Sequence, residues 1–238
     1  ITGGTIRTGG SFTGLRNDFN PAGGAIELYG PDDASLGHWI GSSFHDVIIN
    51  KGSVALDGGP VVRKEKGKSG QKSTRNSDVE QTLRYRHDGS SYPVDRMSSV
   101  TAVYNLDIDG DLIFQDGFFT PDANMIDIER DFDISGTLLL DEEDYIRTGR
   151  FVFWRDGSQC SAQGGEFHCE NGWYFYDGCN VPMQSSVTVY MDGTGSGFIR
   201  NYSHSLNAQF GSLVIDKFQG GLVSLVDSSY PVRAVELR

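Results

Sequence analysis

The sequence predicts an all-β protein whose chain winds into a parallel β-solenoid of about 20 residues per turn, interrupted by one long loop. Three observations support this fold class. Apolar and polar residues alternate along short segments with the period of a strand, one such segment recurs 20 residues further on, and 31 of the 238 residues are glycine. Glycine at about 13% is nearly twice its ordinary share, as many tight turns require. An antiparallel β-sandwich is the alternative, because it also contains many short alternating strands.

Residues 1–60 are expected to begin the solenoid, because they contain the first copy of a long repeat. "FHDVIINK" (44–51) returns as "FGSLVIDK" (210–217), and the segments upstream of both also match. Internal repeats are typical of stacked architectures, so residues 164–238 are expected to begin a second unit. The matching upstream positions lie 161 residues apart: Gly3/Gly164, Gly4/Gly165, Pro21/Pro182, Ile26/Val187, Leu28/Val189 and Tyr29/Tyr190.

Residues 61–98 break the alternation and are expected to form a long basic loop. They hold nine of the twenty Lys and Arg residues together with five acidic residues. A solvated loop is one interpretation, and attraction to nucleic acid or another anionic surface is the other. Because the whole chain carries a net charge of −12, we expect no nucleic-acid partner. We expect the loop to be the least regular part and to lie near the acidic segment 107–144.

Residues 99–163 are expected to complete the first unit, and they contain a short repeat. "NLDIDGDLIFQDG" (105–117) is followed by "MIDIERDFDISG" (125–136). One turn of a solenoid cannot bury its own inner face, so apolar residues of successive turns have to stack to form the core. Four apolar pairs lie 20 residues apart and are expected to stack: Leu106/Ile126, Ile108/Ile128, Leu112/Phe132 and Phe114/Ile134.

The acidic residues of the short repeat should point outward and stack on one another. They are Asp107, Asp109, Asp111, Asp127, Glu129, Asp131 and Asp133. Like charges opposed in a sheet are destabilising, and three hypotheses are open. The residues form a solvated face, the first six of them bind Ca²⁺ through carboxylate oxygens, or a pair acts as acid and base in cleaving a polysaccharide. The periodic pattern argues against the last hypothesis, because a catalytic site is singular.

Aromatic residues form a second candidate surface. "FVFWRDG" and "GWYFYDG" bring Trp154, Trp173, Tyr174 and Tyr176 close together in the sequence. Alternation turns about half of these side chains into the core and leaves the others outside. Exposed aromatic planes suit the apolar faces of sugars, and an exposed patch marks a binding site. Packing in the core is the competing interpretation.

The three cysteines lie at spacings of nine and ten residues. Cys160 and Cys179 are nearly one turn apart, so we expect them to stack on adjacent turns at a Cα distance that a disulfide accepts. Cys169 is expected to be a free thiol that points into the core. Three unpaired thiols in small core sites are the alternative.

The motifs "GGTIRTGGSFTG", "FNPAGG", "FHDVIINK" and "NLDIDGDL" follow one another along the chain. Together they resemble the repeats of very large secreted surface proteins of Bacteroidota. The resemblance covers most of the chain outside residues 61–98. It implies an adhesin or gliding-type surface filament that is exported by the type IX system to the extracellular cell surface. It brings no catalytic residues.

We therefore expect a non-catalytic structural and adhesive module. Its partners would be neighbouring repeat units of the same chain, surface glycans or other filament subunits. A β-helix that binds or cleaves carbohydrate is the alternative. The five His residues show no metal-ligand spacing, and the chain contains no nucleophile elbow, phosphate loop or dinucleotide motif. Apart from the Ca²⁺ considered above, no cofactor is expected.

Three expectations concern the membrane and the ends of the chain. No apolar run approaches the ~20 residues of a membrane span, so no membrane insertion is expected. The chain starts at Ile1 without Met or a signal peptide, so we expect a mature chain or part of a longer protein. Both ends are expected to be open turns rather than polar caps.

Overall fold

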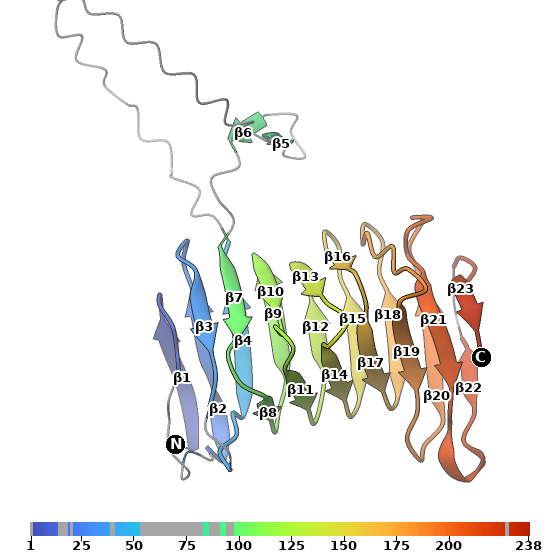
Figure 1. Ribbon diagram of the computed structural model, residues 1–238, viewed down its shortest axis with the longest axis horizontal. Helices are drawn as coiled ribbons and strands as arrows, with labels where there is room; N and C mark the ends of the chain where they lie inside the picture. The colour runs from blue at the N-terminus through green and yellow to red at the C-terminus, as the bar shows by residue number, and fades with distance from the viewer. Residues whose placement is uncertain are drawn as a thin grey trace, which may run out of the picture.

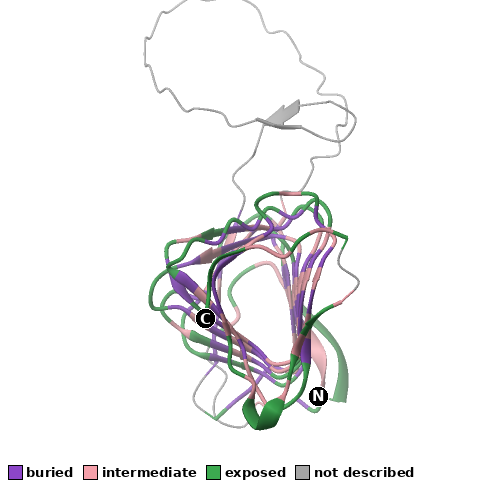
Figure 2. Ribbon diagram, turned by 90° about the vertical axis from the view of Figure 1, so that its right-hand side faces the viewer, coloured by how far each residue is buried: buried purple, intermediate pink, exposed green. Residues whose placement is uncertain are grey.

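The computed structural model describes residues 2–13, 19, 21–38, 41–52, 83–85, 91–93, 98–226 and 229–238. In these residues the chain winds through about nine turns of a parallel β-solenoid. The predicted fold class is therefore confirmed, and the β-sandwich alternative is wrong. Figure 1 shows the turns side by side along the long axis, from β1 to β22 and β23. Seen along that axis, the walls of the solenoid enclose the interior (Figure 2).

Three parallel sheets form the walls, and the chain passes from sheet A to sheet B to sheet C before it starts the next turn. Sheet A contains β1 (Thr2–Thr8), β2 (Gly23–Tyr29), β4 (Asp46–Asn50), β9 (Leu112–Asp116), β12 (Phe132–Ile134), β15 (Phe151–Trp154), β18 (Gly172–Phe175), β20 (Gly197–Asn201) and β22 (Val223–Leu225). Sheet B contains β3 (Ala34–Leu36), β7 (Ser99–Ala102), β10 (Phe118–Thr120), β13 (Thr137–Leu140) and β16 (Gln159–Ala162). Sheet C contains β8 (Leu106–Ile108), β11 (Met125–Ile128), β14 (Tyr145–Thr148), β17 (Gly165–Cys169), β19 (Val187–Met191), β21 (Phe210–Ile215) and β23 (Ala234–Leu237). Outside the three sheets, β5 (Leu83–Tyr85) and β6 (Ser91–Pro93) pair antiparallel, and a short 3₁₀ helix, η1 (Phe218–Gly220), follows β21.

The short repeat has the register that the sequence predicts. In sheet C, β8 pairs with β11, and in sheet A, β9 pairs with β12. The paired residues are Leu106/Ile126, Ile108/Ile128, Leu112/Phe132 and Phe114/Ile134. All eight side chains are buried, while the residues between them face outward. A strand period of two, repeated every 20 residues, therefore accounts for the walls of these turns.

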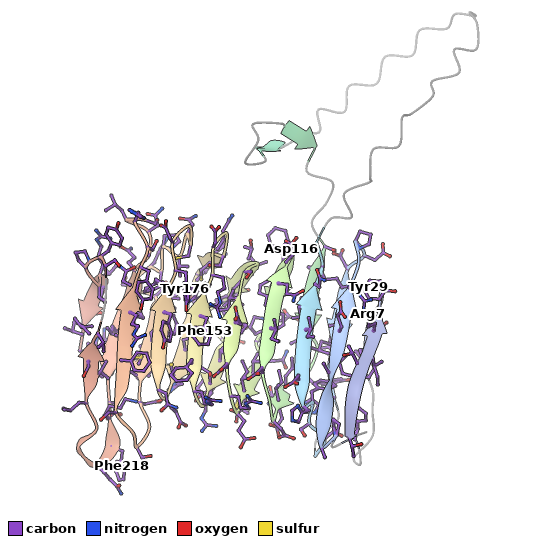
Figure 3. The ribbon with its side chains drawn as sticks, turned by 180° about the vertical axis from the view of Figure 1, so that it is seen from behind. Arg7, Tyr29, Asp116, Phe153, Tyr176 and Phe218 are labelled. Carbon is purple, nitrogen blue, oxygen red and sulfur yellow. The ribbon has the colours of Figure 1, made fainter. Side chains whose placement is uncertain are left out.

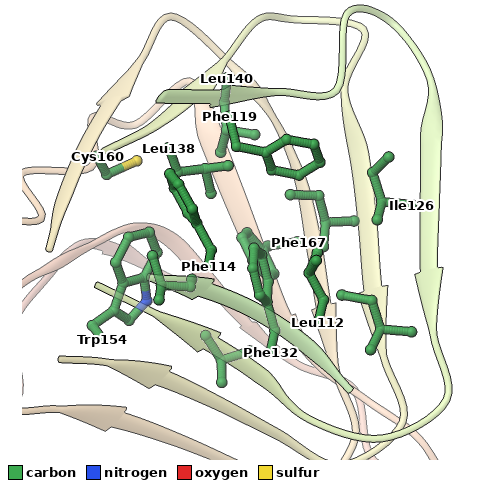
Figure 4. Close-up of a cluster of buried hydrophobic side chains, with 14 of the residues drawn as sticks. Leu112, Phe114, Phe119, Ile126, Phe132, Leu138, Leu140, Trp154, Cys160 and Phe167 are labelled. Atoms are coloured by element: carbon green, nitrogen blue, oxygen red, sulfur yellow. The ribbon is translucent and has the colours of Figure 1, made fainter. Parts of the chain in front are cut away.

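The core is one continuous column of apolar side chains inside the walls. Figure 4 shows a section of it, where Phe114, Phe119, Phe132 and Phe167 fill the interior together with Leu112, Leu138 and Trp154. Aromatic rings meet within it, with Phe132 and Phe167 stacked at a centroid distance of 6.1 Å. Because every turn contributes to the same column, the burial of each turn depends on its neighbours.

The two copies of the long repeat occupy corresponding sets of strands on different walls. The first copy supplies β1, β2 and β4, which are adjacent in sheet A, and the second supplies β17, β19 and β21, which are adjacent in sheet C. Each copy starts with a glycine at positive φ, +93° at Gly4 and +106° at Gly165. A side chain at Gly165 would also meet the carbonyl oxygen of Asp141 at 2.9 Å. Glycine is therefore required at this point of the repeat.

The lysine that ends each copy points back along the stack. Lys51 is fully buried, and its Nζ donates hydrogen bonds to the carbonyl oxygens of Gly9, Tyr29 and Asp32. Lys217 donates in the same manner to the carbonyl oxygens of two successive turns, those of Glu170 and Asp192. Each lysine therefore connects its own turn to the turns before it, which explains why the repeated eight-residue segment ends in Lys.

Neither end of the described chain folds back as a cap. β1 pairs with β2 alone, β22 with β20 alone, and β23 with β21 alone. The side chains of β23 are exposed, including Leu237 at 68%. The prediction of open terminal turns is therefore confirmed for the residues that the structure describes.

The predicted disulfide between Cys160 and Cys179 is wrong, because all three cysteines are buried free thiols. Gln159 pairs with Asn180, so the turn here has 21 residues and Cys179 lies beside Ser158 instead of Cys160. Burial raises the pKa of the Cys160 thiol to about 12. Cys169 lies in the core as a free thiol, as predicted.

The predictions for residues 61–98 lie outside the described residues, apart from Ser98 and the backbone of β5 and β6. These predictions include the irregularity of the segment and its proximity to residues 107–144. Ser98 itself is buried at the start of the solenoid wall that follows, where its hydroxyl donates to the carbonyl oxygen of Lys51.

Candidate functional site

Two outer faces of the solenoid carry the residues that the sequence singles out. The acidic face is the outer surface of sheet C and its corner with sheet A. The aromatic face is the outer surface of sheet A over β12, β15, β18 and β20. Both faces are built by outward-pointing residues of successive strands, so the register between turns determines which side chains meet.

On the acidic face the predicted carboxylates stack as expected, and one groove collects most of them. Asp107 pairs with Asp127 in the ladder of β8 and β11. An open groove of about 480 Å³ brings these two together with further acidic residues, and its lining consists of Asp107, Asp109, Asp127, Glu129, Arg147, Gly149 and Glu170. Asp111 and Asp131 lie at the neighbouring corner, where the Asp131 N–H donates to the Asp111 carboxylate at 3.1 Å.

Arginines that the sequence analysis did not consider partly neutralise this face. Arg147 on β14 pairs with Asp127 on β11, which in turn pairs with Asp107 on β8. Its guanidinium bonds Asp127 at 3.0 Å and Glu170 at 2.7 Å. Arg130 lies 3.6 Å from Asp111, at the corner beside the groove. The stacked like charges are thus compensated by cations from the next turns.

The structure does not bring together a Ca²⁺ ligand set from the proposed residues, which are Asp107, Asp109, Asp111, Asp127, Glu129 and Asp131. Among the described residues, no three His, Cys, Asp or Glu side chains come together in an arrangement that could hold a metal ion. Pairing between strands separates these carboxylates by the spacing of the ladder, and Arg147 already binds the Asp127 carboxylate. Of these carboxylates, Asp107, Asp109 and Glu129 are exposed to solvent.

Burial nevertheless leaves some of these carboxylates with altered acidity. Partial burial raises the pKa of Asp107, and the negative charges of Asp109 and Asp127 raise it further. Partial burial also raises the pKa of Asp131 and of Asp144. Asp144 is almost fully buried and accepts hydrogen bonds from the N–H groups of Ala123 and Asp141.

These shifts predict that the protein becomes more stable in mild acid. The relevant pH window lies between 3.8, the ordinary aspartate pKa, and the raised pKa of these groups in the folded protein. In this window the folded protein binds more protons than the unfolded chain. Stability therefore rises as pH falls through this window. We expect the melting temperature at about pH 5 to exceed that at about pH 7.5 at constant ionic strength. Asp107→Asn should reduce the difference, and a melting temperature that falls from the higher to the lower pH would contradict the prediction.

On the aromatic face, six side chains from three neighbouring strands and the residues directly after them pack together on the outside of the wall. They are Phe151, Phe153, Tyr174, Tyr176, Phe198 and Tyr202. Figure 3 shows Phe153 and Tyr176 side by side on this face. Phe153 and Tyr174 are paired across β15 and β18 with ring centroids 4.8 Å apart. Tyr174 and Tyr176 stack at 6.0 Å.

Arginine side chains place their guanidinium groups over these rings. The Arg155 guanidinium carbon is 4.7 Å from the ring centre of Phe153 and 4.6 Å from that of Tyr176. Arg155 also holds the Asp133 carboxylate with two nitrogen atoms, at 2.9 and 2.6 Å. Arg200 lies 5.0 Å from the ring of Phe198. Cation–π contact and ion pairing fix these long side chains on the sheet.

A groove of about 740 Å³ opens beside the aromatic rings, toward the N-terminal turns. Tyr176 and Ile113 provide its apolar surface. Its complete lining is Ile113, Gln115, Asp133, Ser135, Arg155, Asp156, Tyr176 and Asp177. The groove thus combines a flat ring with amide, hydroxyl, carboxylate and guanidinium groups on a rigid parallel sheet.

The four aromatic residues proposed from the sequence divide between the core and the surface. Trp154 and Trp173 are 0% exposed, with ring centroids 6.2 Å apart, so a ligand-binding role for them is wrong. Their strands place Tyr174 and Tyr176 on the outer face, where both are half-buried. The sequence analysis missed the arginines and the phenylalanines of this face. Because Trp154 and Ile199 are buried, strand alternation places the neighbouring residues of "FVFWR" and "GFIRNY" outside.

A smaller aromatic stack lies on sheet C and is useful for comparison. The His168 ring lies between the rings of Tyr145 and Tyr190, at centroid distances of 4.7 and 4.4 Å. His168 Nδ1 is 2.5 Å from the carboxylate of Asp192. This stack belongs to the acidic face and is therefore on a different wall from the aromatic face.

Comparisons with known proteins add no assignment. No family model matches the chain, and neither a curated protein nor a solved structure is significantly similar to it. In the part of the chain that the structure describes, no helix is long and apolar enough to cross a membrane.

Proposed function

We propose that this chain is a non-catalytic structural and adhesive module of a long cell-surface or filament-forming protein. The observation that carries the proposal is the continuity of the stack. From β1 to β23, each described turn pairs with the next through parallel ladders, around one uninterrupted core. Such a stack is a stiff support that can be lengthened by adding turns, because each turn contacts only its neighbours.

The outer faces suit the adhesive part of the proposal. Outward-pointing side chains do not contribute to the core, so they can form a contact surface without loss of the fold. The aromatic face presents half-buried rings and fixed arginines in this manner. The resemblance of "FNPAGG" and "FHDVIINK" to repeats of Bacteroidota surface proteins supports export by the type IX system and an extracellular location. Neighbouring repeat units, surface glycans and filament subunits are the proposed partners.

The alternative function is a carbohydrate-binding or carbohydrate-cleaving β-helix. The groove on sheet A favours binding, because it joins a tyrosine ring to several polar side chains. Cleavage differs from adhesion in releasing new reducing ends. The two functions are therefore separated by measuring products as well as retention.

Beads that carry the chain test the proposed function directly. The beads are perfused over surfaces coated with neutral polysaccharides, anionic polysaccharides or the chain itself, and retention under shear is recorded. We expect retention on at least one surface that exceeds that of beads carrying heat-unfolded chain, without release of reducing ends. Release of reducing ends by the chain, or retention equal to the unfolded control on every surface, would overturn the proposal.

A further inference from the structure

We propose that the groove on the outer face of sheet A binds a neutral polysaccharide that runs along the solenoid axis across β9, β12, β15 and β18. This inference deepens the proposed adhesive function and rests on it for its biological meaning. It names the chemical class of the ligand and the residues that hold it.

Two columns of outward side chains border the path of this ligand. In the first column, backbone hydrogen bonds place one residue of each turn beside the next, in the order Gln115, Ser135, Arg155, Tyr176 and Tyr202. In the second column, strand pairing places Ile113, Asp133, Phe153, Tyr174 and Arg200 in register. The columns run along the stack because successive strands are parallel and regularly spaced. A ligand that follows them meets one new pair of side chains in every turn.

The spacing of the turns suits a chain of sugar units. Parallel strands are about 4.8 Å apart, which is close to the length of one hexopyranose unit in an extended polysaccharide. A sugar ring has an apolar face of C–H groups and a rim of hydroxyl groups. Tyr176 offers the part of its ring that Arg155 does not cover, and the other turns offer polar groups within reach of the rim. Each turn can therefore contact about one sugar unit.

The polar groups of the groove favour a ligand that donates hydrogen bonds and carries no negative charge. Asp156 and Asp177 are exposed carboxylates, which accept hydrogen bonds and repel anions. The cation that faces them, Arg155, is already bound by the Asp133 carboxylate. A polyanion would find no unpaired cation in the lining of this groove. Sugar hydroxyls, in contrast, can donate to the Asp156 carboxylate and to the Asp177 carboxylate, whose Oδ1 also accepts a hydrogen bond from the His204 N–H.

The binding surface is held in place before any ligand arrives. Arg155 is fixed between the rings of Phe153 and Tyr176 and by its ion pair to Asp133. Tyr176 is fixed in turn by stacking on Tyr174. Side chains that are already ordered lose little conformational entropy on binding. The site is thus suited to moderate affinity that multiplies when several sugar units are bound together.

Native gel electrophoresis through embedded polysaccharide tests the inference. The probes are hydroxyethylcellulose, xyloglucan and β-1,3-glucan as neutral polymers, with polygalacturonate as the anionic polymer. We expect at least one neutral polymer to retard the 238-residue chain, and polygalacturonate to leave its migration unchanged. Tyr176→Ala should weaken the retardation about tenfold, the loss expected for a central aromatic contact. Gln115→Ala, at the other end of the groove, should weaken it to a smaller extent.

Tyr190→Ala is the matched control, because Tyr190 is a half-buried outer aromatic residue on sheet C. It should migrate like the unmodified chain in each gel, and thermal unfolding should confirm that all variants are folded. The inference is overturned if no neutral polymer retards the chain, if Tyr176→Ala and Gln115→Ala bind as well as the unmodified chain, or if polygalacturonate retards it most. If beads carrying the chain are still retained under shear when one of these results is found, the adhesive function is supported but this groove is not its binding site. Release of reducing ends would overturn the proposed function, while retardation that depends on Tyr176 would still support the site.

Discussion

Replacing Trp173 with alanine is expected to lower the free energy of unfolding by about 3–5 kcal/mol, the cost of removing a large aromatic side chain from a packed core. Trp173 is fully buried and lies at the centre of an aromatic cluster. Its ring centroid is 5.1 Å from that of Phe167, 5.3 Å from that of Phe210 and 6.2 Å from that of Trp154. These neighbours come from different turns, so the cavity would loosen the packing of the stack along its axis as well as within one turn.

Urea unfolding followed by circular dichroism measures this effect, and Tyr174→Ala is the control. Tyr174 is the next residue on β18 and points outward. Its loss should cost about 1 kcal/mol or less, as is usual for a surface position. Trp173→Phe should cost less than Trp173→Ala, because the indole Nε1 has no hydrogen-bond partner among the described residues. Equal losses for Trp173→Ala and Tyr174→Ala would contradict the assignment of inner and outer faces.

The contrast between these two residues explains why the sequence alone could not separate the core from the outer aromatic face. In "FVFW" and "GWYFY" both sets of alternate positions are apolar or aromatic. A strand period of two then has no polar partner to mark the outer face. In the short repeat, by contrast, aspartates occupy most of the outward positions, and the four stacked apolar pairs from Leu106/Ile126 to Phe114/Ile134 were predicted with the correct register.

Errors on the acidic face have a different cause. The predictions for this face rest on two copies of the short repeat, although the spacing of 20 continues into "YIRTGRFVFW". In that third copy Arg147 takes the place of Asp127, and the two residues pair in adjacent strands. One more step of the same repeat would have placed a cation on the carboxylates. Because a carboxylate that already binds a guanidinium is a poor ligand for Ca²⁺, the third copy also argues against a cation site.

The cysteine prediction was wrong because the turn length is not constant. The short repeat has 20 residues, whereas the turn that connects Gln159 to Asn180 has 21. Cys179 therefore lies level with a position two residues before Cys160. A shift of two residues keeps a side chain on the inner face but moves it along the strand. Cys160 and Cys179 are accordingly both buried and are not paired. Turn lengths depend on corner geometry, which strand alternation does not report.

Replacing Lys51 with methionine is expected to cost about 3 kcal/mol, because the substitution leaves three partly buried carbonyl groups without their hydrogen-bond donor. The ammonium group of lysine has three N–H donors, and Lys51 uses them on Gly9 at 2.8 Å, Tyr29 at 3.0 Å and Asp32 at 3.0 Å. Methionine has a similar length and fills the same space, so the loss reports hydrogen bonding more than packing. Lys217→Met should act in the same direction through Glu170 and Asp192.

Arg238→Met is the control for this pair, since Arg238 is 60% exposed and bonds Glu236 at the surface. An exposed ion pair of this kind contributes about 0–1 kcal/mol. Lys51 and Lys217 belong to different copies of the long repeat and donate to different carbonyl oxygens, so their effects should add in the double variant. Urea unfolding of the four variants measures the losses. If Lys51→Met were as stable as Arg238→Met, water would have replaced the ammonium group. The final lysine of the long repeat would then not be the residue that holds successive turns together.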